Sequence, residues 1–182
     1  MYISISNKVS SYFNLSAAKN FYYSHIYSSL SYCIIVWGGW LTLAKYDSLS
    51  KKLTKIICNI FWRFCIPYQC KFCIFKKFKL LNLYDIYKLQ LMKLMYVSVS
   101  SPSSRISGYI NKQPRYLHHD LRVINQFVVP HFRVNQVKFN FEHQALSLWN
   151  SLPAYIKESN SIKIFKRLYV DFLIKDYCSH AI

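Results

Sequence analysis

Glycine is scarce in this sequence, and its scarcity argues against two kinds of catalytic loop. The chain has three glycines in 182 residues, and two of them are adjacent, at positions 38 and 39. It therefore contains no glycine-rich phosphate-binding loop and no Gly-x-Ser-x-Gly nucleophile elbow. Neither P-loop nucleotide hydrolysis nor serine hydrolase chemistry is expected.

Acidic residues are also few, and no two of them are adjacent. The seven are Asp47, Asp85, Asp120, Glu142, Glu158, Asp171 and Asp176. Metal-dependent nucleotidyl transfer needs two or three carboxylates that converge on two cations. We therefore predict no catalytic residues, and the chain is not expected to be an enzyme by itself.

A long apolar run is missing as well, and the N-terminal residues give no reason to expect a secretory signal. Between Lys19 and Lys45 the only ionisable side chains are His25 and tyrosines, but the strictly apolar part, residues 32–40, is short of the roughly 20 residues that a membrane span needs. We expect a buried helix that ends at Gly38 and Gly39, in a nuclear or cytoplasmic protein that is not in the membrane. A small basic membrane-associated protein that uses residues 32–43 is the alternative.

The six cysteines offer one possible metal ligand pair, Cys70 and Cys73, with Cys65 just before it and His118-His119 far downstream. A structural zinc site needs four ligands, and no second Cys-x-x-Cys pair follows. Reduced thiols are therefore the favoured interpretation, and no metal or cofactor is predicted.

What the sequence has in abundance is positive charge and hydrophobic residues. Lys and Arg total 24, the formal net charge is +17, and 53% of the residues are hydrophobic. Such a chain can form a core, and its self-repulsion would be relieved by a polyanion. RNA or DNA is the favoured partner, an anionic membrane surface is second, and a compositional accident is third.

Apolar periodicity predicts a mainly α fold. The second predicted helix has an apolar stripe from Leu49 to Phe64, a cap at Asp47 or Ser48, and a stop at Pro67. The third is apolar nearly all round, so it should be packed on two sides. The expected helices cover residues 19–37, 49–64, 83–97 with Asn82 as cap, 142–149, and 162–174 with Ser161 or Ser159 as cap.

Three regions follow from this pattern. Residues 1–18 are irregular, residues 19–98 form a helical bundle, and residues 99–182 form a small α+β tail. The serine-rich stretch 98–104 marks the joint. In the tail, residues 127–129 and 134–141 are expected to form a short β-hairpin, followed by the last two helices.

The exposed face of the second helix is the clearest candidate for binding a phosphate backbone. It carries Lys51, Lys52, Lys55 and Arg63. A second basic cluster, with Lys76 and Lys77, lies in residues 66–81, which we expect to be a mobile connector.

Several motifs together resemble the C-terminal end of the reverse transcriptase of jockey-like non-LTR retrotransposons. Trp149-Asn150-Ser151-Leu152-Pro153, a spacer, then Phe165-Lys166 and a helix are similar to that family's closing Trp-Asn-x-Leu-Pro pattern. Upstream, residues 26–38 are similar to its Tyr-x-x-Leu … Tyr-Gly-x-x-Trp-Gly helix, where Cys33 stands in place of the usual first glycine. The basic helix with Lys51-Lys52 and Lys55, Leu83-Tyr84-Asp85-Ile86-Tyr87, and Arg122 … Val129-Pro130 … Arg133 fall in the same order.

The resemblance implies an RNA-directed DNA polymerase, but only the part after its palm. The Tyr/Phe-x-Asp-Asp centre is absent, so no catalytic residue is carried over. It implies a thumb-like bundle and tail that bind nucleic acid beside a missing polymerase core; a non-functional relic is the alternative. The motif residues are expected to be structural: Trp37, Trp149, Asn150, Leu152, Pro153 and Phe165.

Overall fold

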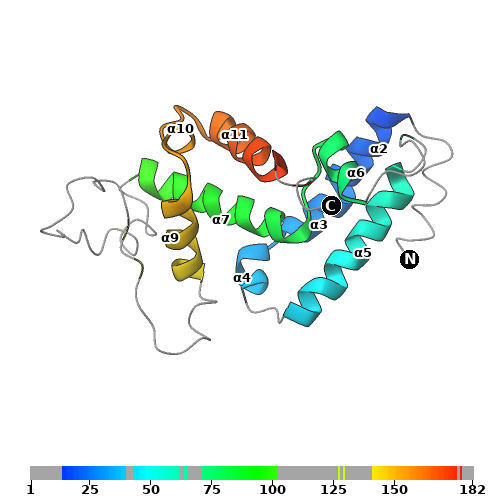
Figure 1. The fold of residues 1–182 in the computed structure, drawn as a ribbon, viewed down its shortest axis with the longest axis horizontal. Helices are drawn as coiled ribbons and strands as arrows, with labels where there is room; N and C mark the ends of the chain where they lie inside the picture. The colour runs from blue at the N-terminus through cyan, green and yellow to red at the C-terminus, as the bar shows by residue number, and fades with distance from the viewer. Residues whose placement is uncertain are drawn as a thin grey trace, which may run out of the picture.

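The computed structural model describes residues 14–39, 43–61, 64, 71–101, 127, 129, 141–175 and 177. These residues are mainly helical, as the sequence predicts, and contain no strand (Figure 1). The expected β-hairpin is not supported, since Phe127 and Val129 have no regular structure and Phe141 begins a helix; residues 130–140 lie outside the described part. The helices are α2 (Leu15–Phe21), the π-helix η1 (Tyr22–Tyr27), α3 (Ser28–Ser31), α4 (Ile34–Gly38), α5 (Leu43–Phe61), α6 (Lys71–Phe78), α7 (Leu83–Ser100), α9 (Phe141–Ser151), α10 (Ala154–Lys157) and α11 (Ile162–Lys175).

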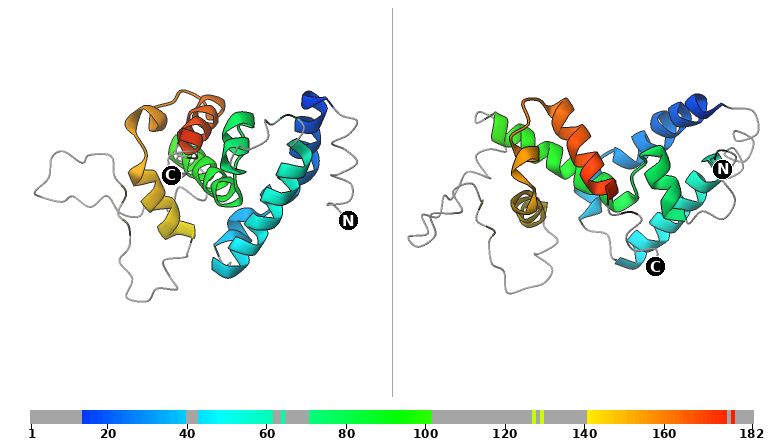
Figure 2. Two further views of the ribbon diagram at one scale, coloured as in Figure 1. Left: turned by 45° about the vertical axis from the view of Figure 1, so that its right-hand side comes forward. Right: turned by 45° about the horizontal axis from the view of Figure 1, so that its top comes forward.

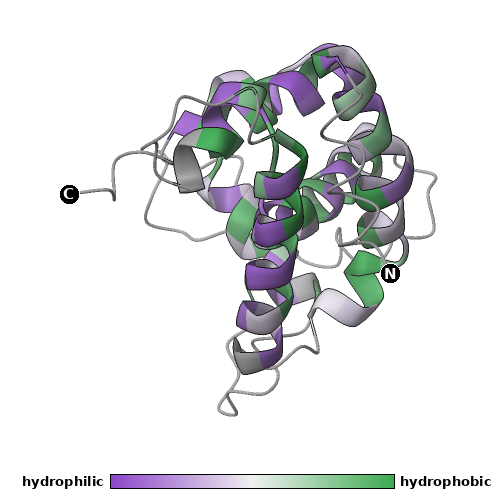
Figure 3. Ribbon diagram, turned by 90° about the vertical axis from the view of Figure 1, so that its right-hand side faces the viewer, coloured by the Kyte–Doolittle hydropathy of each residue, from purple (hydrophilic) through white to green (hydrophobic). Residues whose placement is uncertain are grey.

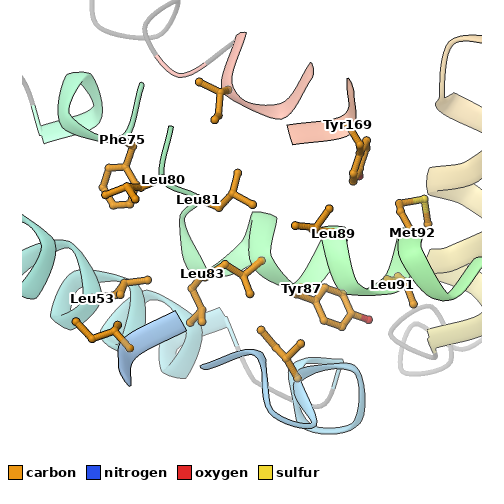
Figure 4. Close-up of a cluster of buried hydrophobic side chains, with 14 of the residues drawn as sticks. Leu53, Phe75, Leu80, Leu81, Leu83, Tyr87, Leu89, Leu91, Met92 and Tyr169 are labelled. Atoms are coloured by element: carbon orange, nitrogen blue, oxygen red, sulfur yellow. The ribbon is translucent and has the colours of Figure 1, made fainter. Parts of the chain in front are cut away.

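Helix α7 lies at the centre and is buried on both sides, as predicted. It contacts α3, α4 and α5, which precede it in the chain, and α9 and α11, which follow it. In Figure 1, α11 lies above α7 and α4 lies below it. Figure 4 shows Leu83 beside Leu53 of α5 at the start of α7, and Met92, near the middle of α7, close to Tyr169 of α11. The Asn82 side chain accepts a hydrogen bond from the Asp85 amide at 2.8 Å, so the predicted cap is confirmed.

The predicted break at Ser98 is wrong by three residues, because α7 continues to Ser100. Ser98 is buried, and its hydroxyl donates to the Leu94 carbonyl at 2.8 Å. This local bond satisfies the hydroxyl inside the helix, so serine does not end the helix there.

The first predicted helix is present but interrupted. It begins earlier than expected, at Leu15, so residues 15–18 are helical rather than irregular. Its middle turns widen into the π-helix η1, and it breaks at Tyr32 and Cys33. Cys33 takes a left-handed conformation, with φ at 49°, and the Trp37 indole N–H closes the break by donating to the Tyr32 carbonyl at 2.9 Å. The predicted end at Gly38 and Gly39 agrees with the structure.

Gly38 allows α4 to pack closely on α7. A Cβ atom at position 38 would lie 2.6 Å from Cδ2 of Tyr87. The Tyr87 ring is almost completely buried and has little room to move. Glycine is therefore required here by the close approach of α4 to α7.

Helices α5 and α6 correct two further predictions. Helix α5 begins at Leu43, so Asp47 and Ser48 lie inside it and do not cap it. The expected mobile connector at 66–81 instead contains helix α6. Residue Phe78 of α6 stacks on Phe61 of α5 with ring centroids 4.8 Å apart, and this apolar contact explains why a lysine-rich segment forms a packed helix. Pro67 lies outside the described residues.

The C-terminal helices form an aromatic layer over α7. The ring of Phe165 stacks on Tyr96 at 4.6 Å, on Tyr169 at 6.0 Å and on Trp149 at 6.1 Å. Ser161 accepts a hydrogen bond from the Ile164 amide at 3.3 Å, in agreement with a cap for α11. Figure 2 shows α11 lying along α7, with α9 crossing near the C-terminal end of α7.

The helices around α7 carry both kinds of residue, as expected of elements that cover a core. Figure 3 shows hydrophilic residues in purple and hydrophobic residues in green along these helices. Within the described residues, no helix combines the length and apolar character needed to cross a bilayer.

Replacement of Gly38 by alanine should destabilise the protein by about 1–3 kcal/mol, because the new methyl group overpacks the Tyr87 ring. Urea unfolding of the wild type and of Gly38→Ala measures this. In a Tyr87→Leu background the same substitution should cost less, since the smaller side chain removes the clash. An equal cost in both backgrounds would argue against this contact as the cause.

Alkaline pH should unfold the protein. Burial raises the pKa of Tyr87 to about 12, with a smaller contribution from Tyr84, and burial also raises the pKa values of Tyr22, Tyr46, Tyr169 and Tyr177 above the usual range. The unfolded phenols ionise near pH 10.0, so the folded state holds more protons above that pH. Stability should be complete below pH 10 and fall as pH rises toward 12. Parallel titrations of helicity and tyrosinate absorbance would test this; ionisation of all the tyrosines while helicity is retained would contradict it.

Candidate nucleic-acid interface

The exposed face of α5 carries the strongest of the predicted lysine clusters. Lys51, Lys52 and Lys55 are all exposed, and the buried residues Leu53 and Ile57 lie on the opposite side of the helix. None of the three lysines forms an ion pair with a described residue. Since Lys51 and Lys55 are one turn apart, they are separated by about 6 Å along the axis. This is close to two nucleotide steps of about 3.4 Å on a duplex strand.

The two lysines of the second predicted basic cluster, Lys76 and Lys77, differ in their contacts. Lys76 and Lys77 are both exposed on α6. The Lys77 ammonium donates to the carbonyl of Phe64 at 2.8 Å and lies 5.6 Å from the centre of the Phe78 ring. It therefore helps to join α6 to Phe64, three residues after the end of α5. Lys76 has no such contact among the described residues.

Two other sequence predictions cannot be placed. Arg63, Cys65 and Cys70 lie outside the described residues, as does the side chain of Cys73. In the part of the chain that the structure describes, no group of three His, Cys, Asp or Glu side chains is arranged to hold a metal ion.

Most of the motif residues lie in α9, in α11 and at the turn before α10, whereas Trp37 lies in α4. Trp149, Leu152 and Phe165 are buried, and Trp37 is half-buried. The Leu152 amide donates to the Trp149 carbonyl at 3.1 Å, and Pro153 is the N-cap residue before α10. Leu152 and Pro153 therefore form the turn between α9 and α10.

Asn150 has a role that sequence reasoning missed. We expected it to end its helix, but its side chain instead binds residue 127. Its Oδ1 atom accepts from the Phe127 amide at 2.9 Å, and its Nδ2 atom donates to the Phe127 carbonyl at 2.7 Å. The Asn150 side chain thus satisfies both backbone hydrogen-bonding groups of Phe127, as a paired strand would. The two residues are 23 positions apart, so no local sequence pattern indicates that they pair.

A groove that the sequence did not indicate lies between η1 and α11. It has a volume of about 340 Å³. Tyrosines of η1 form one side, basic residues of α11 form the other, and Leu81 and Leu89 contribute apolar surface. The lining residues are Tyr22, Tyr23, Tyr27, Lys79, Leu81, Leu89, Lys163, Lys166, Arg167, Val170 and Asp171.

Electrostatics in the groove favour an anion. Four cationic side chains and one carboxylate line it, and that carboxylate, Asp171, is paired with Lys79 at 2.8 Å. Nearby, burial and the charge of Lys166 lower the pKa of Lys93. Positive charge therefore concentrates at this groove as well as on α5.

Comparisons of the chain with protein-family models, with curated proteins and with solved structures find no match.

Removal of the Asn150 side chain should destabilise the protein by about 1–3 kcal/mol, because Asn150→Ala leaves a half-buried amide and carbonyl without partners. Thermal or urea unfolding measures the change in stability, and hydrogen exchange at the Phe127 amide should become faster. Ser151→Ala is the matched control, since the Ser151 hydroxyl bonds only to Leu148 within the same helix. Equal effects of the two substitutions would contradict this role.

Proposed function

We propose that this chain is a non-catalytic, nucleic-acid-binding C-terminal segment of a non-LTR retrotransposon reverse transcriptase, acting in the nucleus or cytoplasm. The observation that carries the binding role is the exposed face of α5, where Lys51, Lys52 and Lys55 lie without ion-pair partners among the described residues. Lysines along one helix face neutralise successive phosphates and release counterions, which gives salt-dependent, sequence-tolerant binding.

The backbone at two motif positions supports the resemblance to the retrotransposon family. Cys33 has a left-handed conformation, which favours glycine, and the family pattern has glycine at this position. Gly38, the glycine of the Trp-Gly pair, is the residue that lets α4 approach Tyr87. Both positions at which the family pattern has glycine are thus positions where the backbone of this chain favours or requires glycine.

Exposed apolar side chains support the association with a polymerase core. Tyr32, at the turn between α3 and α4, is 76% exposed, and Val36, in α4, is 69% exposed. Large apolar side chains gathered around one turn are typical of contact surfaces. In the proposal this turn faces the core that the resemblance implies and that this chain lacks.

The binding role predicts a change in salt dependence when the α5 lysines are neutralised. The triple variant Lys51→Gln, Lys52→Gln, Lys55→Gln should bind duplex nucleic acid of any sequence more weakly. The slope of log affinity against log salt should fall by about 2.7, at 0.9 for each phosphate that the variant no longer neutralises. Fluorescence anisotropy with a labelled duplex, over about 50–200 mM salt, measures both quantities.

Lys175→Gln is the control, because Lys175 is an exposed lysine of α11 that lies outside both the α5 face and the groove. It should leave the slope almost unchanged. If the triple variant keeps the wild-type affinity and salt slope, α5 is not the binding interface. A wild-type chain that shows no cooperative thermal transition would favour the relic instead.

A further inference from the structure

The groove between η1 and α11 joins two features that the proposed function does not use, exposed tyrosine and concentrated positive charge. Tyr23 is 46% exposed, and its ring makes edge contacts with Tyr22 at 5.1 Å and with Tyr27 at 5.6 Å. These contacts hold the exposed ring in one orientation. Opposite it lie Lys163, Lys166 and Arg167.

The π-helix explains how three tyrosines reach one groove. In a π-helix, hydrogen bonds join residues five apart rather than four, and such turns occur often at functional sites. Tyr22 and Tyr27 are five residues apart, and their ring centres lie 6.4 Å from each other. Tyr23 and Tyr27 are four apart and also touch. The widened turn therefore gathers all three side chains at the groove.

The basic wall of the groove is open to a ligand. Lys163, Lys166 and Arg167 are exposed, and none of them pairs with a described carboxylate. The one acidic lining residue, Asp171, is already paired with Lys79. Three cationic groups are therefore available to contact phosphate.

We propose that this groove binds single-stranded nucleic acid, with an unpaired base stacked on Tyr23 and the adjoining phosphates on Lys163, Lys166 and Arg167. The inference rests on the proposed function and adds a second site to it. Bases of a duplex are stacked on each other and cannot lie flat on a side chain, whereas an unpaired base can. The volume of about 340 Å³ lies at the lower end of small-ligand pockets, which suits one nucleotide unit rather than a helix.

The decisive experiment compares three probes: a short labelled oligothymidylate, a DNA duplex, and heparin, which carries negative charge but no bases. Tyr23→Leu keeps an apolar side chain but removes the ring. It should weaken oligothymidylate binding roughly five- to a hundredfold and leave heparin and duplex binding unchanged. Lys163→Gln with Lys166→Gln should lower the salt slope for oligothymidylate by about 1.4, at 0.7 per charge.

Two substitutions serve as matched controls. Tyr155→Leu removes another tyrosine, 59% exposed on α10, and Lys175→Gln removes another lysine of α11. Both should leave oligothymidylate binding unchanged. Photocross-linking of a bromouridine-containing oligonucleotide should label the peptide that contains Tyr22–Tyr27.

The outcomes separate this inference from the proposed function. Wild-type affinity of the Tyr23 and Lys163/Lys166 variants for oligothymidylate, together with weaker binding by the α5 triple variant, overturns the groove and leaves the α5 interface standing. Equally weakened binding of heparin and oligothymidylate in Tyr23→Leu would show that the ring does not recognise bases. An acidic peptide that competes as well as the oligonucleotide would assign the groove to a protein partner. No binding of either nucleic acid by the wild type overturns both proposals.

Discussion

The structure depends on one helix whose surface is apolar almost all round. Because α7 cannot leave either side in water, helices from before and after it in the sequence must cover it. Helices α3, α4 and α5, which precede α7, and α9 and α11, which follow it, all pack on it. Gly38, the aromatic stack around Phe165 and the groove all lie on helices that pack against α7, so their positions depend on it.

Positive charge is excluded from this core and collects on its outside. The lysines of α5 and α11 extend from helix faces whose opposite sides are buried. In the interior of the described part, Asp85 is the one buried carboxylate; it accepts a hydrogen bond from Tyr177 and pairs with Lys88 at 3.4 Å. The apolar core thus holds the cationic faces in place while they repel each other, and a bound polyanion would reduce that repulsion.

Local signals in the sequence predicted the central elements well. Asn82 before an apolar run identified the start of α7, and the uniform apolar character of that run indicated burial on two sides. The α5 lysines were found because charge opposite an apolar stripe repeats at helical spacing. These features depend on residues within a few turns of each other, which is the range over which a sequence pattern carries information.

Features that depend on tertiary contacts were missed. Helix α6 is lysine-rich, and its apolar partner, Phe61, lies outside it. The bonds of Asn150 reach residue 127, and the groove joins η1 to α11 across more than half of the chain. The Tyr177 hydroxyl similarly reaches the first turn of α7, across 92 residues.

During synthesis α7 emerges before α9 and α11, so part of its apolar surface stays uncovered until they follow. The complete structure can therefore form only after α11 has emerged, and until then the uncovered apolar surface of α7 favours aggregation.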